Sequence, residues 1–198
     1  MCIYTPTSKT EYALVWNTHA RITSDVCEEH VKDWTALSPY TTISSPLASV
    51  DATPKPASNP PDLDTPDELA VRSLLLGVVH RTAGQYAASR EFLLDALNHQ
   101  KTIKVSTWVP GVASFEIAVL DLKEADASLG AGGNGSEKVL LSEQDRAAWV
   151  KVLKKAGERL DQALSLSPQS IDMSSRLDSR ITMLRDEIGT KREMVEKA

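Results

Sequence analysis

The distribution of proline is the feature of this sequence that most restricts its fold. Of the 10 prolines in the 198-residue chain, most lie between Ser38 and Asp67, among Ser, Thr, Ala and Asp residues. Proline lacks a backbone N–H and pushes the preceding residue toward extended geometry, so a packed helix cannot run through this stretch. We therefore predict a mobile or extended connector here, with helices confined to either side of it.

The chain after the connector is predicted to be helical almost to its end. Thr65-Pro66-Asp67-Glu68 combines a capping residue, a proline in the first turn and a glutamate that can reach back to the cap. Apolar residues at steps of three and four then predict further helices. Glycines and prolines separate the helices, which we place at 66–82, from 86, after 110, at about 142–166 and from about 174.

The N-terminal part is predicted to form one more amphipathic helix, within Thr10 to Leu37. This segment lacks Pro and Gly, and its apolar face carries Trp16, Ala20, Thr23, Cys27, Val31 and Trp34. The predicted fold class is all-α. Its parts are an N-terminal helical segment at 1–37, a Pro-rich connector at 38–65 and a helical domain at 66–198 with a Gly-rich insertion near 130–136.

Composition argues against several classes of function. The net charge of −5 gives no basic footprint for nucleic acid. No apolar run approaches the ~20 residues of a transmembrane helix, and the first residues do not look like a signal peptide. Two cysteines make no disulfide framework, so we expect a soluble chain in a reducing compartment, the cytoplasm.

A helical-repeat pattern spans the first two helices of the domain. Leu76-Gly77-x-x-His80 and Gly84-x-Tyr86-x-x-Ser89-x-x-x-Leu93-x-x-Ala96-Leu97 follow the tetratricopeptide pattern. Ala156-x-x-x-Leu160-x-x-Ala163-Leu164 matches the second helix of another repeat. These patterns predict tetratricopeptide-like hairpins with a closing C-terminal helix, in which small residues stand where helices touch: Gly77, Ser89, Ala96, Ala156 and Ala163.

Longer motifs resemble the C-terminal region of the fungal inclusion body clearance proteins, relatives of the tetratricopeptide repeat protein 39 family. The resemblance covers about Asp33 to Lys191 and rests on five motifs: Asp33-Trp34-Thr35-x-Leu37-Ser38-Pro39, Asp64-Thr65-Pro66-Asp67-Glu68, Leu75-Leu76-Gly77-Val78-Val79-His80-Arg81, Trp108…Phe115-Glu116-x-Ala118-Val119-Leu120 and Ser174-Ser175-Arg176-Leu177-Asp178-Ser179-Arg180-Ile181. It implies a role in clearing misfolded-protein inclusions, a peripheral link to lipid droplets, and a place in the cytosol, nucleus or mitochondrial outer surface. It brings no catalytic residue.

The predicted function is a non-catalytic adaptor that binds a protein partner. The inner side of the first hairpin helix is expected to carry the contact residues Val71, Leu74, Val78 and Arg81. Arg176 and Arg180, four residues apart, are either a partner or anion contact or part of a solvated helix face. The alternative function is a structural end-piece that caps a longer helical-repeat protein and binds nothing itself.

Sites for cofactors and metals are not predicted. Gly130-Ala131-Gly132-Gly133-Asn134-Gly135 spells a dinucleotide fingerprint but follows a helix, so a flexible linker is the better interpretation. Cys27, His30 and His19 could be metal ligands, yet three ligands on one helix seldom converge. His80 stands in an aromatic packing position of the repeat, which favours a core histidine over a catalytic base.

Overall fold

The computed structural model describes residues 22–47, 63, 65–129, 142–167 and 172–197. Six α-helices occupy these residues, and no strand is found among them, so the all-α prediction is confirmed. The helices are α2 (Ser24–Thr35), α3 (Pro66–Thr82), α4 (Tyr86–Asn98), α5 (Val109–Leu129), α6 (Glu143–Leu166) and α7 (Asp172–Lys197), with a short 3-10 turn η2 (His99–Lys101) after α4.

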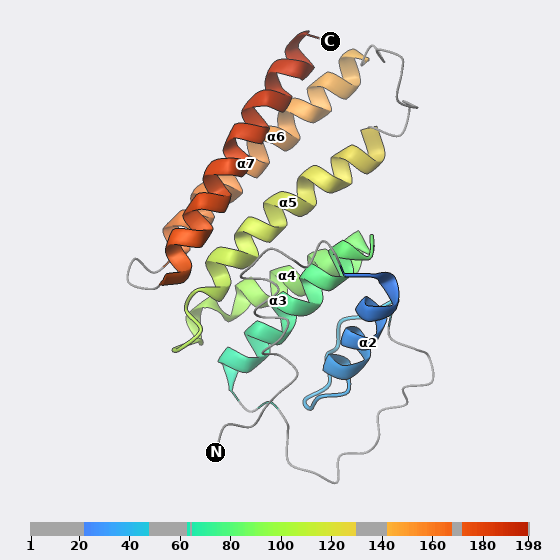
Figure 1. The fold of residues 1–198 in the computed structure, drawn as a ribbon, viewed down its shortest axis with the longest axis vertical. Helices are drawn as coiled ribbons and strands as arrows, with labels where there is room; N and C mark the ends of the chain where they lie inside the picture. The colour runs from blue at the N-terminus through green and yellow to red at the C-terminus, as the bar shows by residue number, and fades with distance from the viewer. Residues whose placement is uncertain (1–21, 48–62, 64, 130–141, 168–171, 198) are drawn as a thin grey trace.

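The helices stack in the order in which the chain makes them. Each packs chiefly on its neighbours in sequence, so that α5 lies between the α3–α4 pair and the α6–α7 pair, and α2 lies against α3 (Figure 1). Stacking in chain order is a property of helical-repeat proteins. The tetratricopeptide type of the hairpins stays a prediction.

Local cap chemistry sets the start of α3. The Thr65 hydroxyl accepts the Glu68 N–H at 3.3 Å, and the Glu68 carboxylate accepts the Thr65 N–H at 3.2 Å, which is the expected capping box. The Asp67 carboxylate in the first turn accepts the backbone N–H groups of residues 104–106. These bonds, that of Ser106 first, lower the pKa of Asp67, and they tie the start of α3 to the loop before α5.

The α3–α4 hairpin is held by a close helix–helix contact. A Cβ placed on Gly77 would lie 2.7 Å from Cγ and Cδ2 of Leu93, so any larger residue there would force Leu93 to shift. The Ser89 hydroxyl donates to the Gly77 carbonyl oxygen at 2.7 Å. The turn between the helices contains Gly84 with φ of 75°, a backbone conformation that glycine adopts readily.

The last three helices form an elongated layer. The buried residues of α6 and α7 recur at steps of three and four, with one step of seven at the end of α7, which is the spacing of a coiled-coil seam: Trp149, Leu153, Ala156, Leu160 and Ala163 on α6, and Leu177, Ile181, Leu184, Ile188 and Val195 on α7. The α5 helix packs closely on α6, since a Cβ on Gly111 would lie 3.1 Å from the Ala163 carbonyl oxygen.

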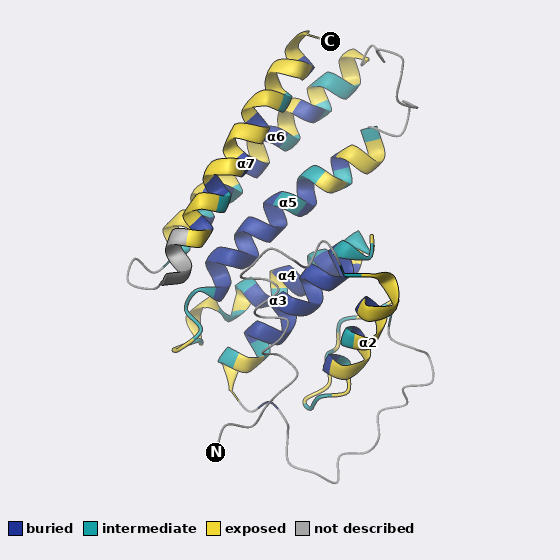
Figure 2. Cartoon of the chain, viewed as in Figure 1, coloured by how far each residue is buried: buried dark blue, intermediate teal, exposed yellow. Residues whose placement is uncertain are grey.

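Burial is concentrated in α3 and α5 (Figure 2). Every residue of α3 from Ala70 to Arg81 is buried, and so is every residue of α5 from Val109 to Ala118. The α2, α6 and α7 helices each bury one face and expose the other. The α3 helix is therefore a central helix with no exposed side along those residues.

The two N-terminal segments differ in part from the prediction. Residues 10–21 of the expected first helix lie outside the described residues, and the helix occupies Ser24–Thr35. Residues 38–47 of the connector are irregular, as their prolines require, yet they are packed on the core through Ile43 and Leu47. Residues 48–62 and 64 lie outside the described residues, as do 130–141 with the Gly-rich insertion.

Candidate interaction surface

The α2 helix has one apolar face and one acidic face. Cys27, Val31 and Trp34 point into the core and are at most 1% exposed. The exposed side carries Asp25, Glu28, Glu29 and Asp33, against a single exposed cation, Lys32. The apolar face was predicted from its spacing, whereas the acidic face was overlooked, although the acidic residues stand close together in the sequence.

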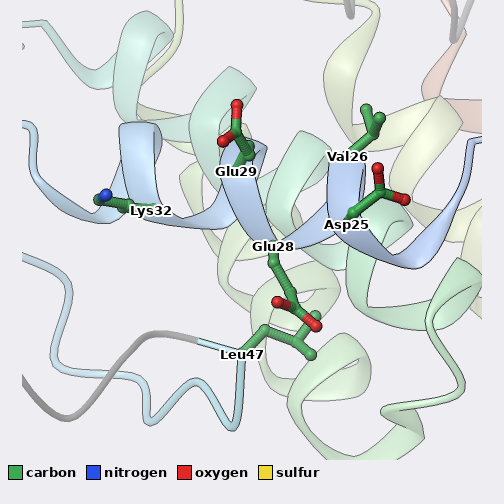
Figure 3. A pocket seen from close by; sticks show the side chains of 6 residues that line it. All are labelled: Asp25, Val26, Glu28, Glu29, Lys32 and Leu47. Atoms are coloured by element: carbon green, nitrogen blue, oxygen red, sulfur yellow. The ribbon is translucent and has the colours of Figure 1, made fainter.

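A hollow of about 530 Å³ lies on this acidic side, between α2 and the chain near Leu47 (Figure 3). We call it the acidic hollow. It is lined by Asp25, Val26, Glu28, Glu29, Lys32 and Leu47. Glu28 extends toward Leu47 in Figure 3, so charged and apolar groups meet in one place. Val26 is 38% exposed, which leaves apolar surface available beside the carboxylates.

The electrostatics of the acidic hollow favour a cationic ligand. A hydrogen bond from the Thr23 side chain is the main cause that lowers the pKa of Asp25, so this carboxyl is ionised at neutral pH. Three acidic side chains and one lysine line the hollow. Carboxylates with an apolar neighbour suit a side chain that has a positive tip and an apolar stem, such as lysine or arginine.

Residues 36–47, which we call the strap, follow α2 and are attached to α3 at two points. Nη1 of Arg72 donates to the carbonyl oxygens of Leu37 at 3.1 Å and Pro39 at 2.7 Å. Further along, the Ser45 hydroxyl lies 2.7 Å from Nε2 of His80. The strap and α2 thus lie together against α3.

His80 is a buried, neutral core residue. Its Nδ1 lies 2.7 Å from the Leu76 carbonyl oxygen, which can only accept, so Nδ1 carries the proton and Nε2 accepts from Ser45. Its ring lies 5.0 Å from that of Phe92. Burial lowers the pKa of His80. These contacts give the side chain a packing role.

The four residues expected to form a contact surface on α3 are not exposed. Val71, Leu74, Val78 and Arg81 are all buried. The expectation assumed that the inner side of α3 is open, but other parts of the chain cover it. In this fold these residues belong to the core, and a partner cannot reach them while α3 remains covered.

Two of the arginines predicted to contact a partner form ion pairs within the molecule. Arg81 donates to Oε2 of Glu116 at 2.6 Å, and Arg180 donates to Oε1 of the same carboxylate at 2.6 Å. Glu116 is fully buried, and the Arg180 guanidinium also lies 4.3 Å from the centroid of the Phe115 ring. Arg180 therefore joins α7 to α5. Arg176, in contrast, is exposed.

The predicted packing residues are all buried. Gly77 and Ser89 lie at the α3–α4 contact described above, and the Ala163 carbonyl lies against Gly111. Ala96 is in the buried face of α4, and Ala156 and Ala163 are in that of α6.

A second hollow, of about 460 Å³, lies between α4, α5 and α6. Its charges are paired with one another. Arg90 binds Asp121 and Glu124, and Lys155 lies 3.3 Å from Asp121. The charges of two cations and two carboxylates cancel in this hollow. Its electrostatic attraction for a charged partner is therefore weaker than that of the acidic hollow.

Of the candidate metal ligands, Cys27 and His30 lie in the described part of the chain. Among the described residues no group of three metal-ligating side chains comes together, and burial raises the pKa of the Cys27 thiol. His19 and the glycines at 130–135 lie outside the described residues. Of the helices that the structure describes, none has the length and apolar composition that a membrane span requires.

No family model, curated protein or solved structure matches the chain.

Proposed function

We propose that this chain is a non-catalytic helical adaptor that binds a basic segment of a partner protein at the acidic hollow. The observation that carries the proposal is the lining of one surface hollow by Asp25, Glu28 and Glu29 together with the apolar residues Val26 and Leu47. Exposed charges supply attraction and specificity, and adjacent apolar groups supply area that can be removed from water.

The proposal extends to a cellular role through the family resemblance. A chain similar to the inclusion body clearance proteins would use its adaptor surface in the handling of misfolded protein, in the cytoplasm and with a peripheral link to lipid droplets. Lysine- and arginine-rich segments are the partner chemistry that the acidic hollow supports.

The test measures binding of a short fluorescent peptide that alternates lysine with leucine, by anisotropy. The triple variant D25N/E28Q/E29Q should bind it about tenfold more weakly, because each exposed charge pair contributes up to about 1 kcal/mol. Added salt should weaken binding to the unmodified chain.

The matched control is D178N/E187Q/E196Q, which removes the same number of exposed carboxylates from α7. It changes the net charge equally but leaves the acidic hollow intact, so its binding should equal that of the unmodified chain. Equal losses in the two triple variants would mean that only net charge matters and would refute the proposed site.

A structural end-piece is the alternative function, and oligomeric state separates the two. An end-piece should expose the apolar face of its first hairpin and self-associate. In this fold α2 covers α3 instead, which favours the adaptor. Sedimentation of a monomer at all concentrations would support the adaptor, and reversible self-association would support the end-piece.

A further inference from the structure

The hollow between α4, α5 and α6 contains a buried carboxylate that uses only one of its two oxygens. Asp121 is 5% exposed and lines this hollow of about 460 Å³. Its Oδ1 atom accepts from Nη2 of Arg90 at 2.6 Å and from Nζ of Lys155 at 3.3 Å. Its Oδ2 atom is buried and has no hydrogen-bond partner among the described residues. Such an acceptor has lost water without gaining a donor, so the site favours a group that donates to it.

The donors around Asp121 are directed to other acceptors. Nη2 of Arg90 also donates to the Glu124 carboxylate at 2.5 Å. The Ser128 hydroxyl donates to the backbone carbonyl oxygen of Glu124 at 2.8 Å. The Lys155 side chain is 52% exposed, so its ammonium can turn toward solvent and leave the hollow open. A hydrogen bond to Oδ2 therefore has to come from water or from a bound molecule.

The balance of charges in this hollow favours an uncharged molecule. A cationic ligand would meet Arg90 and Lys155, and an anionic ligand would meet Asp121 and Glu124. Repulsion from the like charges would offset much of the attraction in either case. A neutral donor avoids this repulsion, and its hydrogen bond to a carboxylate is stronger than one between two neutral groups. The preferred ligand is therefore uncharged and carries a hydroxyl or an amide N–H.

The remaining wall of the hollow is apolar. Ala125 and Leu129 of α5 and Ala148 and Val152 of α6 line it. Leu129, Ala148 and Val152 are half-buried, so a ligand that covers them removes apolar surface from water. Sites for small molecules typically have volumes of about 300–1,000 Å³ and combine apolar walls with a few polar groups. This hollow has that size and that composition.

We propose that this hollow binds a small uncharged molecule with an aliphatic body and one hydrogen-bond donor, a hydroxyl or an amide N–H. The donor binds Oδ2 of Asp121, and the aliphatic body lies against Leu129, Ala148 and Val152. This inference goes beyond the proposed function, because the site lies on α4, α5 and α6 and takes a small molecule, whereas the acidic hollow lies on α2 and takes a basic segment.

The experiment compares n-hexanol with methyl pentyl ether, which are isomers of the same size, and of which only the alcohol donates a hydrogen bond. Each is titrated into the full chain, and two-dimensional NMR follows the amide shifts of residues 121–129 and 148–155. These shifts should saturate with the alcohol. The affinity for the alcohol should be at least about tenfold higher than that for the ether, because the alcohol donates to a charged acceptor.

The Asp121→Asn variant tests the role of Oδ2. Arg90 and Lys155 should hold the amide oxygen in the place of Oδ1, so that the amide N–H group takes the place of Oδ2 and donates where the carboxylate accepted. The affinity ratio between the alcohol and the ether should therefore fall from about tenfold to about one. The ion pair of Arg90 with Glu124 remains in this variant, and a circular dichroism melt checks that it folds.

The Ala148→Phe variant tests the hollow independently of the carboxylate. Its side chain fills the space beside the apolar wall and leaves Asp121 unchanged, so both isomers should lose binding. Ala147→Phe is the matched control, since Ala147 is exposed and does not line the hollow. Its affinity for the alcohol should equal that of the unmodified chain.

Three results would overturn the inference. They are shifts that rise without saturation, equal affinities of the alcohol and the ether for the unmodified chain, and unchanged binding in the Ala148→Phe variant. The D25N/E28Q/E29Q chain separates this inference from the proposed function, because it should bind the alcohol as the unmodified chain does, whether or not it binds the lysine-rich probe.

Discussion

Glu116 is the residue at which α3, α5 and α7 are joined by charge. Its two carboxylate oxygens accept from Arg81 and Arg180, and the carboxylate is fully removed from solvent. A buried ion pair is not a strong source of net stability, but removal of one partner leaves the other charge buried and unpaired. Here a single carboxylate serves two guanidinium groups.

Glu116→Gln should therefore lower the free energy of unfolding by about 3–5 kcal/mol. Asp126→Asn is the control, because Asp126 pairs with Lys191 at the surface and its loss should cost about 1 kcal/mol or less. Urea denaturation of both variants gives the two values. Equal, small losses would show that the Glu116 network contributes no more than a surface pair.

Gly77 offers a second test at the same scale. Gly77→Leu should destabilise by about 1–3 kcal/mol or more, because its side chain would overlap Leu93, which is fully buried. Gly157→Ala in α6 is the matched control, since a Cβ there meets nothing within 4 Å. It should stabilise by roughly 0.5–1 kcal/mol through helix propensity. Thermal melts that shift in the same direction for both would contradict the close contact at Gly77.

His80 makes stability depend on pH in the mildly acidic range. An unfolded histidine has a pKa of about 6.5, whereas burial holds the pKa of folded His80 lower. Below about pH 6.5 the unfolded chain therefore binds a proton that the folded chain does not. The free energy of unfolding should fall with decreasing pH, by at most about 1.4 kcal/mol per pH unit, until folded His80 also protonates.

The control for this effect is His80→Gln, which removes the titrating group. Its absolute stability will differ because the contact with the Phe92 ring is lost, so the slopes against pH are compared and not the values. Identical slopes of the two proteins as the pH falls below about 6.5 would assign the pH dependence to other groups.

At the scale of the helices, the limits of α3 could be predicted but its surroundings could not. Thr65, Pro66 and Glu68 fix the start of the helix through contacts within four residues, so the sequence contains the whole signal. The burial of Val71 and Val78 depends on segments that are far away in the chain. Sequence spacing identifies an apolar face, but it does not identify what covers that face.

The charged residues show the same division between local and distant causes. Arg81 and Glu116 are 35 positions apart, and Arg180 is 64 positions from Glu116. Viewed in sequence, Arg180 belongs to a run of polar residues that is typical of a solvated helix face. Its pairing depends on the packing of α7 beside α5, which no local pattern specifies.

At the scale of the whole molecule, removal of residues 1–37 should expose the apolar side of α3. Trp34 and Val31 leave the core in this deletion, so the melting temperature should fall and a dye for apolar surface should bind. Trp34→Ala in the full chain is the milder form, with an expected loss of about 3–5 kcal/mol. An unchanged melt and no dye binding in the deleted chain would show that α2 is irrelevant to the fold.

The burial of α3 on all sides also predicts the order in which backbone amides exchange with solvent. Amide hydrogens exchange with solvent through local openings or through global unfolding. Between Ala70 and Arg81 no side of α3 reaches solvent, and several neighbouring elements would have to separate before these amides could exchange. They should be the last to take up deuterium, after those of α2, and should report the global free energy of unfolding. The segment that resists exchange longest is thus expected to lie directly beneath α2, a helix whose outer face reaches solvent.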